Sequence, residues 1–259
     1  MNRTLWRFAG LCTLVLAAVW AIPAGAQMSE VKEKAPMYTY VSFWNIPRAQ
    51  WADFEKSDAA DQKVLDQAMA NGTLMAYGSD TNMIHQPDGF THDDWWSATS
   101  MAGILNVLNQ FYSNGSTTTP VLAAATKHAD EILVSRYYNY HAGSWKGVYL
   151  HGSSYKLKPD APDDAVEMLS KNLLVPFFEK LLANGTIHEY DIDTEAIHSE
   201  APGTFWVFYI ATNPDSLDKV NAALRDTIKS NPLGGQAFGY MVDFSAHRDY
   251  LSLTNATYK

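Results

Sequence analysis

Two histidines occupy matching positions in a stretch of the sequence that occurs twice. Residues 70–99 and 183–212 align without a gap, and twelve of the thirty residues are identical. His85 and His198 fall at the same place in the two copies. Because imidazole titrates near neutrality, such a pair could line a pocket and move protons. The alternative is structural, since a turn sequence, Pro-Asp-Gly or Ala-Pro-Gly, follows each histidine shortly afterwards.

Two arginines form a second matched pair near the end of each half of the chain. Arg136 and Arg248 each precede a tyrosine by two residues. A strand arginine can clamp a carboxylate or a phosphate in a bidentate fork, and it can equally pair with a surface carboxylate. Side chains alternate along a strand, so Arg136, Tyr138 and Tyr140 are expected on one face, where they would form an aromatic, cationic wall. The candidate ligand-binding residues are therefore His85, His198, Arg136, Tyr138, Tyr140 and Arg248.

A third group of polar residues, His92-Asp93-Asp94, has no counterpart in the second copy, which reads Phe205-Trp206-Val207. One His and two carboxylates can bind a metal ion. Three consecutive strand residues cannot all face the same way, so a solvated loop end is the favoured interpretation. By the same rule, the adjacent residues Trp95 and Trp96 must face opposite sides of their strand.

Other kinds of catalytic centre lack their sequence signals. There is no GxSxG, HExxH, phosphate-loop or dinucleotide-binding pattern. The only cysteine is Cys12, which falls in the predicted leader, so a cysteine nucleophile and a thiolate-held metal are excluded. We predict neither a metal site nor an obligatory cofactor.

The first residues resemble a signal peptide. Arg3 and Arg7 precede an apolar run over residues 8–22, and Ala24-Gly25-Ala26 supplies small residues for cleavage. The run is shorter than the roughly 20 residues of a membrane span. We therefore expect residues 1–26 to be removed, with an exported mature chain and no stable membrane insertion.

The charge balance restricts the partners of the protein. The chain has 28 acidic and 19 basic residues, a formal net charge of −9, and no run of Lys or Arg. Nucleic acids and anionic membrane surfaces bind basic clusters, so both are disfavoured as partners. A small-molecule ligand remains as the expected partner, and the oligomeric state is left open.

The elements that must position these residues follow the same order twice. After a flexible lead-in at 27–36, residues 37–142 and 143–259 each read as strand, helix, strand, strand, helix, strand. In each copy the dipeptide Asn-Gly, at 71–72 and 184–185, is predicted to end the first helix. The first half is predicted to contain strands at 37–44, 73–85, 94–100 and 132–141 and helices at 48–70, from 101 to the break at 114, and at 121–131. The second half is predicted to contain strands at 148–157, 186–198, 205–212 and within 236–256, and helices at 162–182, interrupted at Pro176, and at 215–230.

This order resembles the dimeric α/β-barrel group of ferredoxin-like domains. The resemblance rests on the Asn-Gly-Thr helix ends, on the aromatic strand FWVFYIAT and on the helix opened by NPDSLDKV. It implies an α+β fold in which two ferredoxin-like βαββαβ repeats form an intramolecular barrel-like pair, with helices outside and a ligand in the cleft between the repeats. Helices cover one face of each four-stranded sheet, and the other face of each sheet would be buried against that of its partner.

The resemblance implies several activities. The group includes haem enzymes, cofactor-free monooxygenases and small ligand-binding or stress proteins. The haem members use a helical histidine, and the two main helices of the second half contain none; His128 in the expected helix 121–131 and His247 are the remaining candidates. We expect an exported protein that binds or handles a small molecule. The alternatives are a cofactor-independent monooxygenase or isomerase and a purely structural domain without a pocket.

Overall fold

The computed structural model describes residues 33–87 and 89–259. The predicted signal peptide, residues 1–26, lies outside the described residues, as do residues 27–32 of the lead-in. Within the described part of the chain, no helix is both long enough and apolar enough to cross a membrane.

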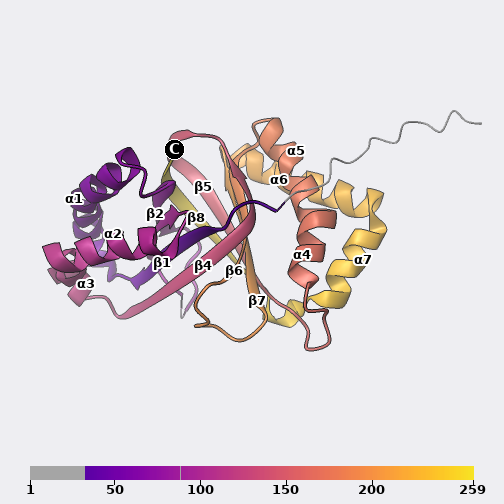
Figure 1. Ribbon diagram of the computed structural model, residues 1–259, viewed down its shortest axis with the longest axis horizontal. Coiled ribbons are helices and arrows are strands. Elements are labelled where there is room, and N and C mark those ends of the chain that lie inside the picture. The colour runs from indigo at the N-terminus through magenta and orange to yellow at the C-terminus, as the bar shows by residue number, and fades with distance from the viewer. Residues whose placement is uncertain (1–32, 88) are drawn as a thin grey trace, which may run out of the picture. The chain divides into compact units, whose positions relative to one another are not determined.

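Eight antiparallel strands close into a barrel (Figure 1). The order around the barrel is β1-β3-β2-β8-β5-β7-β6-β4, and β4 pairs again with β1. Closure leaves every strand paired on both sides, so no sheet edge is exposed to another chain. The strands are β1 (Met37–Asn45), β2 (Ala76–Asn82), β3 (His92–Ala98), β4 (Lys127–Tyr140), β5 (Gly143–Lys156), β6 (Ile187–Glu195), β7 (Thr204–Ala211) and β8 (Arg248–Tyr258).

The helices lie outside the barrel in two groups on opposite sides (Figure 1). The first group packs on β1, β2 and β3, and the second packs on β4, β6 and β7. The first group comprises α1 (Trp51–Ala70), α2 (Met101–Asn114) and α3 (Pro120–Ala123), and the second comprises α4 (Ala165–Leu169), α5 (Val175–Ala183), α6 (Pro214–Ser230) and α7 (Pro232–Met241). The expected α+β class, with helices around a barrel, is thus confirmed.

The two Asn-Gly-Thr sequences end helices, as predicted. Gly72 and Gly185 have φ of 80° and 74°, the left-handed conformation that glycine adopts at least cost. The Asn71 Oδ1 atom accepts hydrogen bonds from the Thr73 backbone N–H at 2.9 Å and from its hydroxyl at 2.6 Å. Asn184 makes the same two bonds to Thr186. The repeated sequence therefore forms a helix end followed by a strand, and the same hydrogen bonds form in both copies.

Two predicted elements differ from the structure, and a third is divided as predicted. The helix expected at 121–131 is only one turn, α3, because β4 begins at Lys127 and pairs with β1 over its whole length. Residues 232–241, predicted to break a helix and enter a strand, form α7 in spite of three glycines. The helix at 162–182 is divided, as its internal proline suggested: a π-helical turn at Ser170–Leu174 separates α4 from α5, and Pro176 lies in the first turn of α5.

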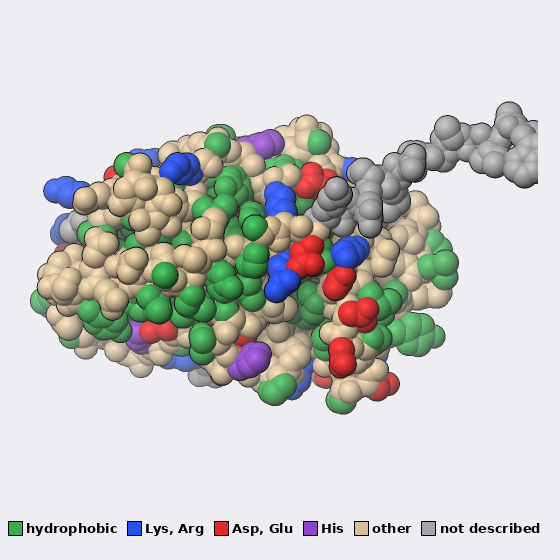
Figure 2. Space-filling model, in the orientation of Figure 1, with side chains coloured by type: hydrophobic (Ala, Val, Ile, Leu, Met, Phe, Trp, Pro, Cys, Tyr) green, Lys and Arg blue, Asp and Glu red, His purple; other side chains and the backbone are tan. Residues whose placement is uncertain are grey.

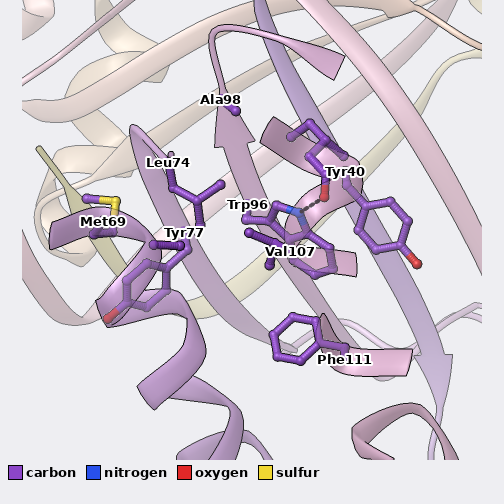
Figure 3. Close-up of a cluster of buried hydrophobic side chains, with 10 residues drawn as sticks. Tyr40, Met69, Leu74, Tyr77, Trp96, Ala98, Val107 and Phe111 are labelled. Carbon is purple, nitrogen blue, oxygen red and sulfur yellow. Dashed lines mark hydrogen bonds between the residues drawn. The ribbon is translucent and has the colours of Figure 1, made fainter. Parts of the chain in front are cut away.

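Trp95 and Trp96 mark the two faces of the sheet, as predicted. Trp96 lies outside the barrel, in a cluster between the sheet and helices α1 and α2 (Figure 3). Its ring stacks on Tyr40 with centroids 4.3 Å apart, and its indole N–H donates to the Ile104 carbonyl at 3.3 Å. Trp95 points inward and joins the side chains that fill the barrel, among them Leu133 and Tyr258.

The barrel interior also contains a group of acidic side chains. Asp80 and Asp93 face each other across the β2–β3 pair, and β6 contributes Glu189, Asp191 and Asp193. All five are buried, and none of them forms an ion pair with Lys or Arg in the described part of the chain. Burial raises the pKa of Asp80 to about 6 and that of Asp191 to about 7, and it also raises the pKa values of Asp93, Glu189 and Asp193 well above their ordinary values. Burial therefore favours the protonated form of each of these carboxyl groups in the folded chain.

Candidate functional site

A cavity of about 950 Å³ opens on the outer face of the barrel, between the sheet and helices α1, α2 and α3. Its wall also includes residues of β5 and β8, so both halves of the chain contribute to it. On the face shown in Figure 2, hydrophobic side chains gather over α2 and the neighbouring strands, and α2 exposes Leu105 and Tyr112. The aromatic residues of the cavity wall are Tyr40, Trp44, Tyr77, Trp96, Phe111, Tyr112 and Trp145.

A histidine and an aspartate meet in this wall. His128 and Asp130 are two residues apart on β4, so they share its outer face. The His128 Nε2 atom lies 2.9 Å from the Asp130 Oδ1 atom. Both side chains are a little over one-third exposed, at 39% and 38%, so a ligand in the cavity can reach them.

The neighbouring strand β1 supplies two hydroxyl groups to the same aspartate. Its register places Ser42 directly opposite Asp130. The Asp130 Oδ1 atom accepts hydrogen bonds from the Ser42 hydroxyl at 2.9 Å and from the Tyr40 hydroxyl at 2.6 Å. Burial, and then this bond to Asp130, raise the pKa of Tyr40 above its ordinary value. Tyr40 therefore acts as a donor to the carboxylate and not as an acid.

The histidine ring is fixed by stacking and by its hydrogen bond. Trp44 lies directly opposite His128 in the β1–β4 register, and the two rings stack with centroids 3.7 Å apart and planes at 12°. When Nε2–H donates to Asp130, the neutral imidazole carries its lone pair on Nδ1. Among the described residues no hydrogen bond to His128 Nδ1 is seen, and only Nε2 contacts Asp130 and Ser42. The pair thus presents one basic nitrogen in a fixed orientation.

Among the charged side chains of the wall, acidic ones outnumber basic ones. The Ser116 hydroxyl donates to Asp61 at 2.5 Å, and burial raises the Asp61 pKa. The acidic side chains Glu55, Asp61, Asp94 and Asp130 line the cavity, whereas Lys146 is the one Lys or Arg among the lining residues. This charge balance disfavours an anionic ligand and suits a neutral one.

His92 is a second histidine of the wall, and its position contradicts the interpretation of His92-Asp93-Asp94 as a solvated loop end. These residues begin β3, and His92 is 1% exposed. Its Nδ1 atom lies 2.9 Å from the Thr91 hydroxyl, and its Nε2 atom is buried with no hydrogen-bond partner. Burial, and secondarily the nearby His85, lower the His92 pKa to about 4, so this ring is neutral at physiological pH.

The two matched histidines of the repeated stretch do not meet. His85 and His198 are both exposed, in the loops that follow β2 and β6. His85 contacts Trp51 edge-on at 5.6 Å, while His198 lies near Glu195. Neither belongs to the cavity wall.

The expectation that Arg136 shares a face with Tyr138 and Tyr140 is wrong. The β4–β6 register shifts between Ser135 and Tyr137, which makes Arg136 the extra residue of a β-bulge. Arg136 consequently points to solvent and pairs with Glu33. Tyr138 and Tyr140 stack on each other at 6.5 Å, and Tyr140 packs on the side chains that fill the barrel. Alternation of side chains fails at a bulge, so the predicted cationic wall does not form.

Arg248, the partner of Arg136 in the sequence comparison, is also exposed. Its guanidinium donates to the backbone carbonyl of His247 at 2.6 Å. The haem candidate His128 lies on a strand and not on a helix. Within residues 33–87 and 89–259, no group of three or more His, Cys, Asp or Glu side chains is arranged to hold a metal ion.

The sequence alone indicated His92 and His128 as candidates but not that they line one cavity, and it did not indicate Asp130. His-x-Asp occurs at 128–130 and again at 247–249, a spacing that places both side chains on one face of a strand. That repeated pattern was the available signal. The pattern at 128–130 does not indicate a shared face when residues 121–131 are predicted to form a helix, because two residues share a face at this spacing only on a strand.

The comparisons with known proteins support the fold. No family model and no curated relative matches the chain. Among solved structures, a "putative monooxygenase" from Lactobacillus acidophilus has a TM-score of 0.65 at 12% identity, over 86% of this chain and 97% of that one. A "putative monooxygenase" from Fusobacterium nucleatum has a TM-score of 0.64 at 9% identity, over 87% and 95% of the chains. An anthrone oxidase-like protein has a TM-score of 0.51 at 8% identity, over 86% and 92%.

At these identities the likeness concerns the fold alone. The likeness supports the expected α+β architecture with a strand barrel. Nothing in the likeness carries residues or substrates over to this chain.

Proposed function

We propose that this protein is an enzyme that takes a proton from a small, neutral aromatic molecule held in the outer cavity, with His128 as the base. The contact between His128 and Asp130 carries the proposal. A carboxylate that holds an imidazole in one tautomer and stabilises its protonated form is the arrangement of many general bases. Here Ser42 and Tyr40 hold the carboxylate in turn.

The charge of the cavity supports a neutral substrate that becomes an anion only during the reaction. The acidic wall disfavours an anion that arrives from solvent. A proton that moves to His128 leaves an anion beside a new cation, so the net charge of the cavity does not change. The aromatic wall would pack on a planar ring. A phenol, a quinol or an anthrone combines a flat ring with a removable proton.

The oxidative version of the reaction follows from the same step. A deprotonated quinol or anthrone is electron-rich and reacts with dioxygen. In the anthrone case one oxygen atom of dioxygen bonds to the deprotonated ring carbon, and the other leaves as water. Two fold neighbours are named as monooxygenases and one as anthrone oxidase-like, which agrees with this version. Isomerisation, in which the proton returns to another atom, is the alternative.

Turnover of anthrone and of a simple quinol by the purified chain tests the proposal, with dioxygen uptake and quinone absorbance as readouts. His128→Gln should lower the rate by about 10²-fold or more, the usual contribution of a general base. His85→Gln is the matched control, because His85 is exposed and outside the cavity wall. Equal rates for wild type and His128→Gln would contradict the assignment. Binding without any turnover would instead favour a ligand-binding protein.

We also propose that the chain is exported, on the basis of the residues that resemble a signal peptide. Cell fractionation and the mass of the mature chain test this. A mature chain that starts near Gln27 outside the cytoplasm supports export, and an intact amino terminus in the cytoplasm contradicts it.

We propose further that the barrel consists of two ferredoxin-like repeats, 37–142 and 143–259. The strand orders β4-β1-β3-β2 and β8-β5-β7-β6 follow one pattern, and they support this view. The two segments, expressed as separate chains, should associate into one barrel. Failure of the co-expressed segments to associate would count against independent repeats.

A further inference from the structure

The second half of the barrel contains a similar group of side chains at the corresponding strand positions. Ser42 pairs with Asp130 across β1–β4, and Ser153 pairs with Asp249 across β5–β8. The Ser153 hydroxyl donates to the Asp249 Oδ1 atom at 2.7 Å, as the Ser42 hydroxyl does to Asp130. The serine–aspartate pair therefore occurs twice, on the outer faces of two different strand pairs.

A histidine accompanies the second pair too. His247 precedes Asp249 by two residues, and its Nε2 atom lies 3.3 Å from the Asp249 Oδ1 atom. Its ring stacks on Tyr155 with centroids 4.5 Å apart and planes at 1°, as His128 stacks on Trp44. The Nδ1 atom lies 3.1 Å from the Ser154 carbonyl and can donate to it. In that tautomer the lone pair is on Nε2, beside Asp249.

One position differs between the two groups in a way that changes the chemistry. His151, opposite Tyr209 on β7, takes the place that Tyr40 occupies opposite Trp96 on β3. The His151 Nε2 atom lies 4.0 Å from Asp249, and its Nδ1 atom is buried without a hydrogen-bond partner. Burial is the largest influence on the His151 pKa and lowers it, while the charge of Asp249 acts in the opposite direction. The second group thus has two imidazoles on one carboxylate and an unsatisfied polar atom.

Helix α7 covers this second group. Phe238 contacts Tyr155 edge-on at 5.2 Å, and Phe244, just after α7, contacts His247. No residue of α7 itself is buried, and Leu233 and Tyr240 are more than three-quarters exposed. Three of its ten residues are glycines, each of which weakens a helix by about 1 kcal/mol relative to alanine. The absence of buried residues and the weak helix propensity both favour opening of α7.

We propose that His247, Asp249, Ser153 and His151 form a second binding site, which takes a planar aromatic molecule with an acidic hydroxyl group and which opens when α7 moves. The ligand class rests on the function proposed for the first cavity. Tyr155 would contact the ring once α7 has moved away, and the two imidazoles and Asp249 would contact the hydroxyl group. The chain would then bind two such molecules, one on each side of the barrel (Figure 1).

Binding stoichiometry tests the second site. The probe is 4-nitrophenol, used at a pH well below the pKa of the phenol, where it is neutral, and measured by equilibrium dialysis against the full chain and against His128→Gln, His247→Gln and the double variant. We expect two sites in the wild type, one in each single variant and none in the double variant. His198→Gln, an exposed histidine that belongs to neither group, is the control and should keep two sites. Thermal unfolding of each variant shows whether it is folded, and His151→Gln provides a second test of the same site.

The outcomes separate the two proposals. One wild-type site that His128→Gln abolishes, with no change in His247→Gln or His151→Gln, overturns the second site and leaves the first. One wild-type site that only His247→Gln abolishes overturns the function proposed for the first cavity and keeps the second site. No binding in the wild type contradicts both.

Two variants of α7 test its role as a cover, in the His128→Gln background. A methyl group at Gly239 has no atom within 4 Å, so Gly239→Ala should stabilise the closed helix without a clash. Because only the open form binds, the apparent affinity should fall by up to about fivefold. Phe238→Ala removes the contact between α7 and Tyr155, so this variant should raise the apparent affinity. Unchanged affinity in both variants overturns the covering role.

Discussion

The Nε2 atom of His128 lies 2.9 Å from the Oδ1 atom of Asp130, on alternate residues of one strand that faces a cavity. The spacing places both groups on the same side of β4, and the opposite strand adds Ser42 and Tyr40 to the carboxylate. The orientation of the imidazole is therefore determined by strand register, which is among the most rigid relationships in the fold.

Replacing the aspartate tests this arrangement. In Asp130→Asn the side-chain amide can donate to His128 Nε2, which would favour the tautomer with its proton on Nδ1. The base would then be blocked, and we expect turnover of the aromatic substrate to fall by about 10³-fold or more. Steady-state kinetics with wild type and variant measure this. Tyr40→Phe keeps the His128–Asp130 contact and should cost about tenfold or less, corresponding to one lost hydrogen bond. A larger loss in Tyr40→Phe than in Asp130→Asn would contradict the assigned roles.

The acidic interior of the barrel predicts an unusual pH dependence of stability. Asp80 and Asp191 have folded-state pKa values of about 6 and about 7, above those of unfolded aspartate. The folded chain therefore binds more protons than the unfolded chain between about pH 4 and pH 7. Each such group lowers the free energy of unfolding by up to about 1.4 kcal/mol per pH unit as the pH rises through this range. We expect a higher unfolding temperature at pH 5 than at pH 8.

The variant Asp193→Asn provides the matched test of that pH dependence. Burial raises the Asp193 pKa well above its ordinary value, and its Oδ1 atom has no hydrogen-bond partner. Asparagine has nearly the same shape and cannot ionise, so the variant should gain stability at pH 8 and change little at pH 5. Asp218→Asn, on the exposed face of α6, is the control. Wild-type stability that rises from pH 5 to pH 8 would show that the barrel carboxyls are not the dominant titrating groups.

A glycine in the barrel wall is predicted to resist substitution. A Cβ atom at Gly78 would lie 2.4 Å from the Cζ2 atom of Trp95. The Trp95 indole cannot easily move, because its N–H donates to Asp80 at 2.9 Å and its ring is packed in the barrel core. Gly78→Ala should destabilise the chain by about 1–3 kcal/mol, the usual cost of overpacking. Denaturant unfolding measures this, with Gly239→Ala as a control that should be neutral or stabilising.

Local features of the fold were accessible from the sequence, and features that depend on register were not. The Asn-Gly-Thr helix ends involve residues two positions apart, so sequence alone predicts them. The bulge at Arg136 arises between β4 and β6, whose paired residues are more than fifty positions apart, and no local sequence pattern predicts it. The α7 helix forms against glycine propensity because α4 and α6 support it.

The candidate site likewise depends on strand register, which the sequence alone does not reveal. Matching of the two halves by residue identity selected His85 and His198, which are exposed. The groups that face the cavity, His128 and Asp130, become visible only when the β1–β4 register places Ser42 and Trp44 opposite them. A histidine and an aspartate two residues apart indicate a shared face, but only if the segment is known to be a strand.

Exchange of substrate hydrogen with solvent tests the central claim most directly. Anthrone in deuterated water without dioxygen should lose its methylene proton signals in NMR spectra faster with the wild-type chain and with His85→Gln than in buffer. The account predicts that His128→Gln slows this catalysed exchange by at least tenfold, because no other cavity residue takes the proton as efficiently. Exchange as fast with His128→Gln as with the wild type would contradict the assignment of His128 as the base.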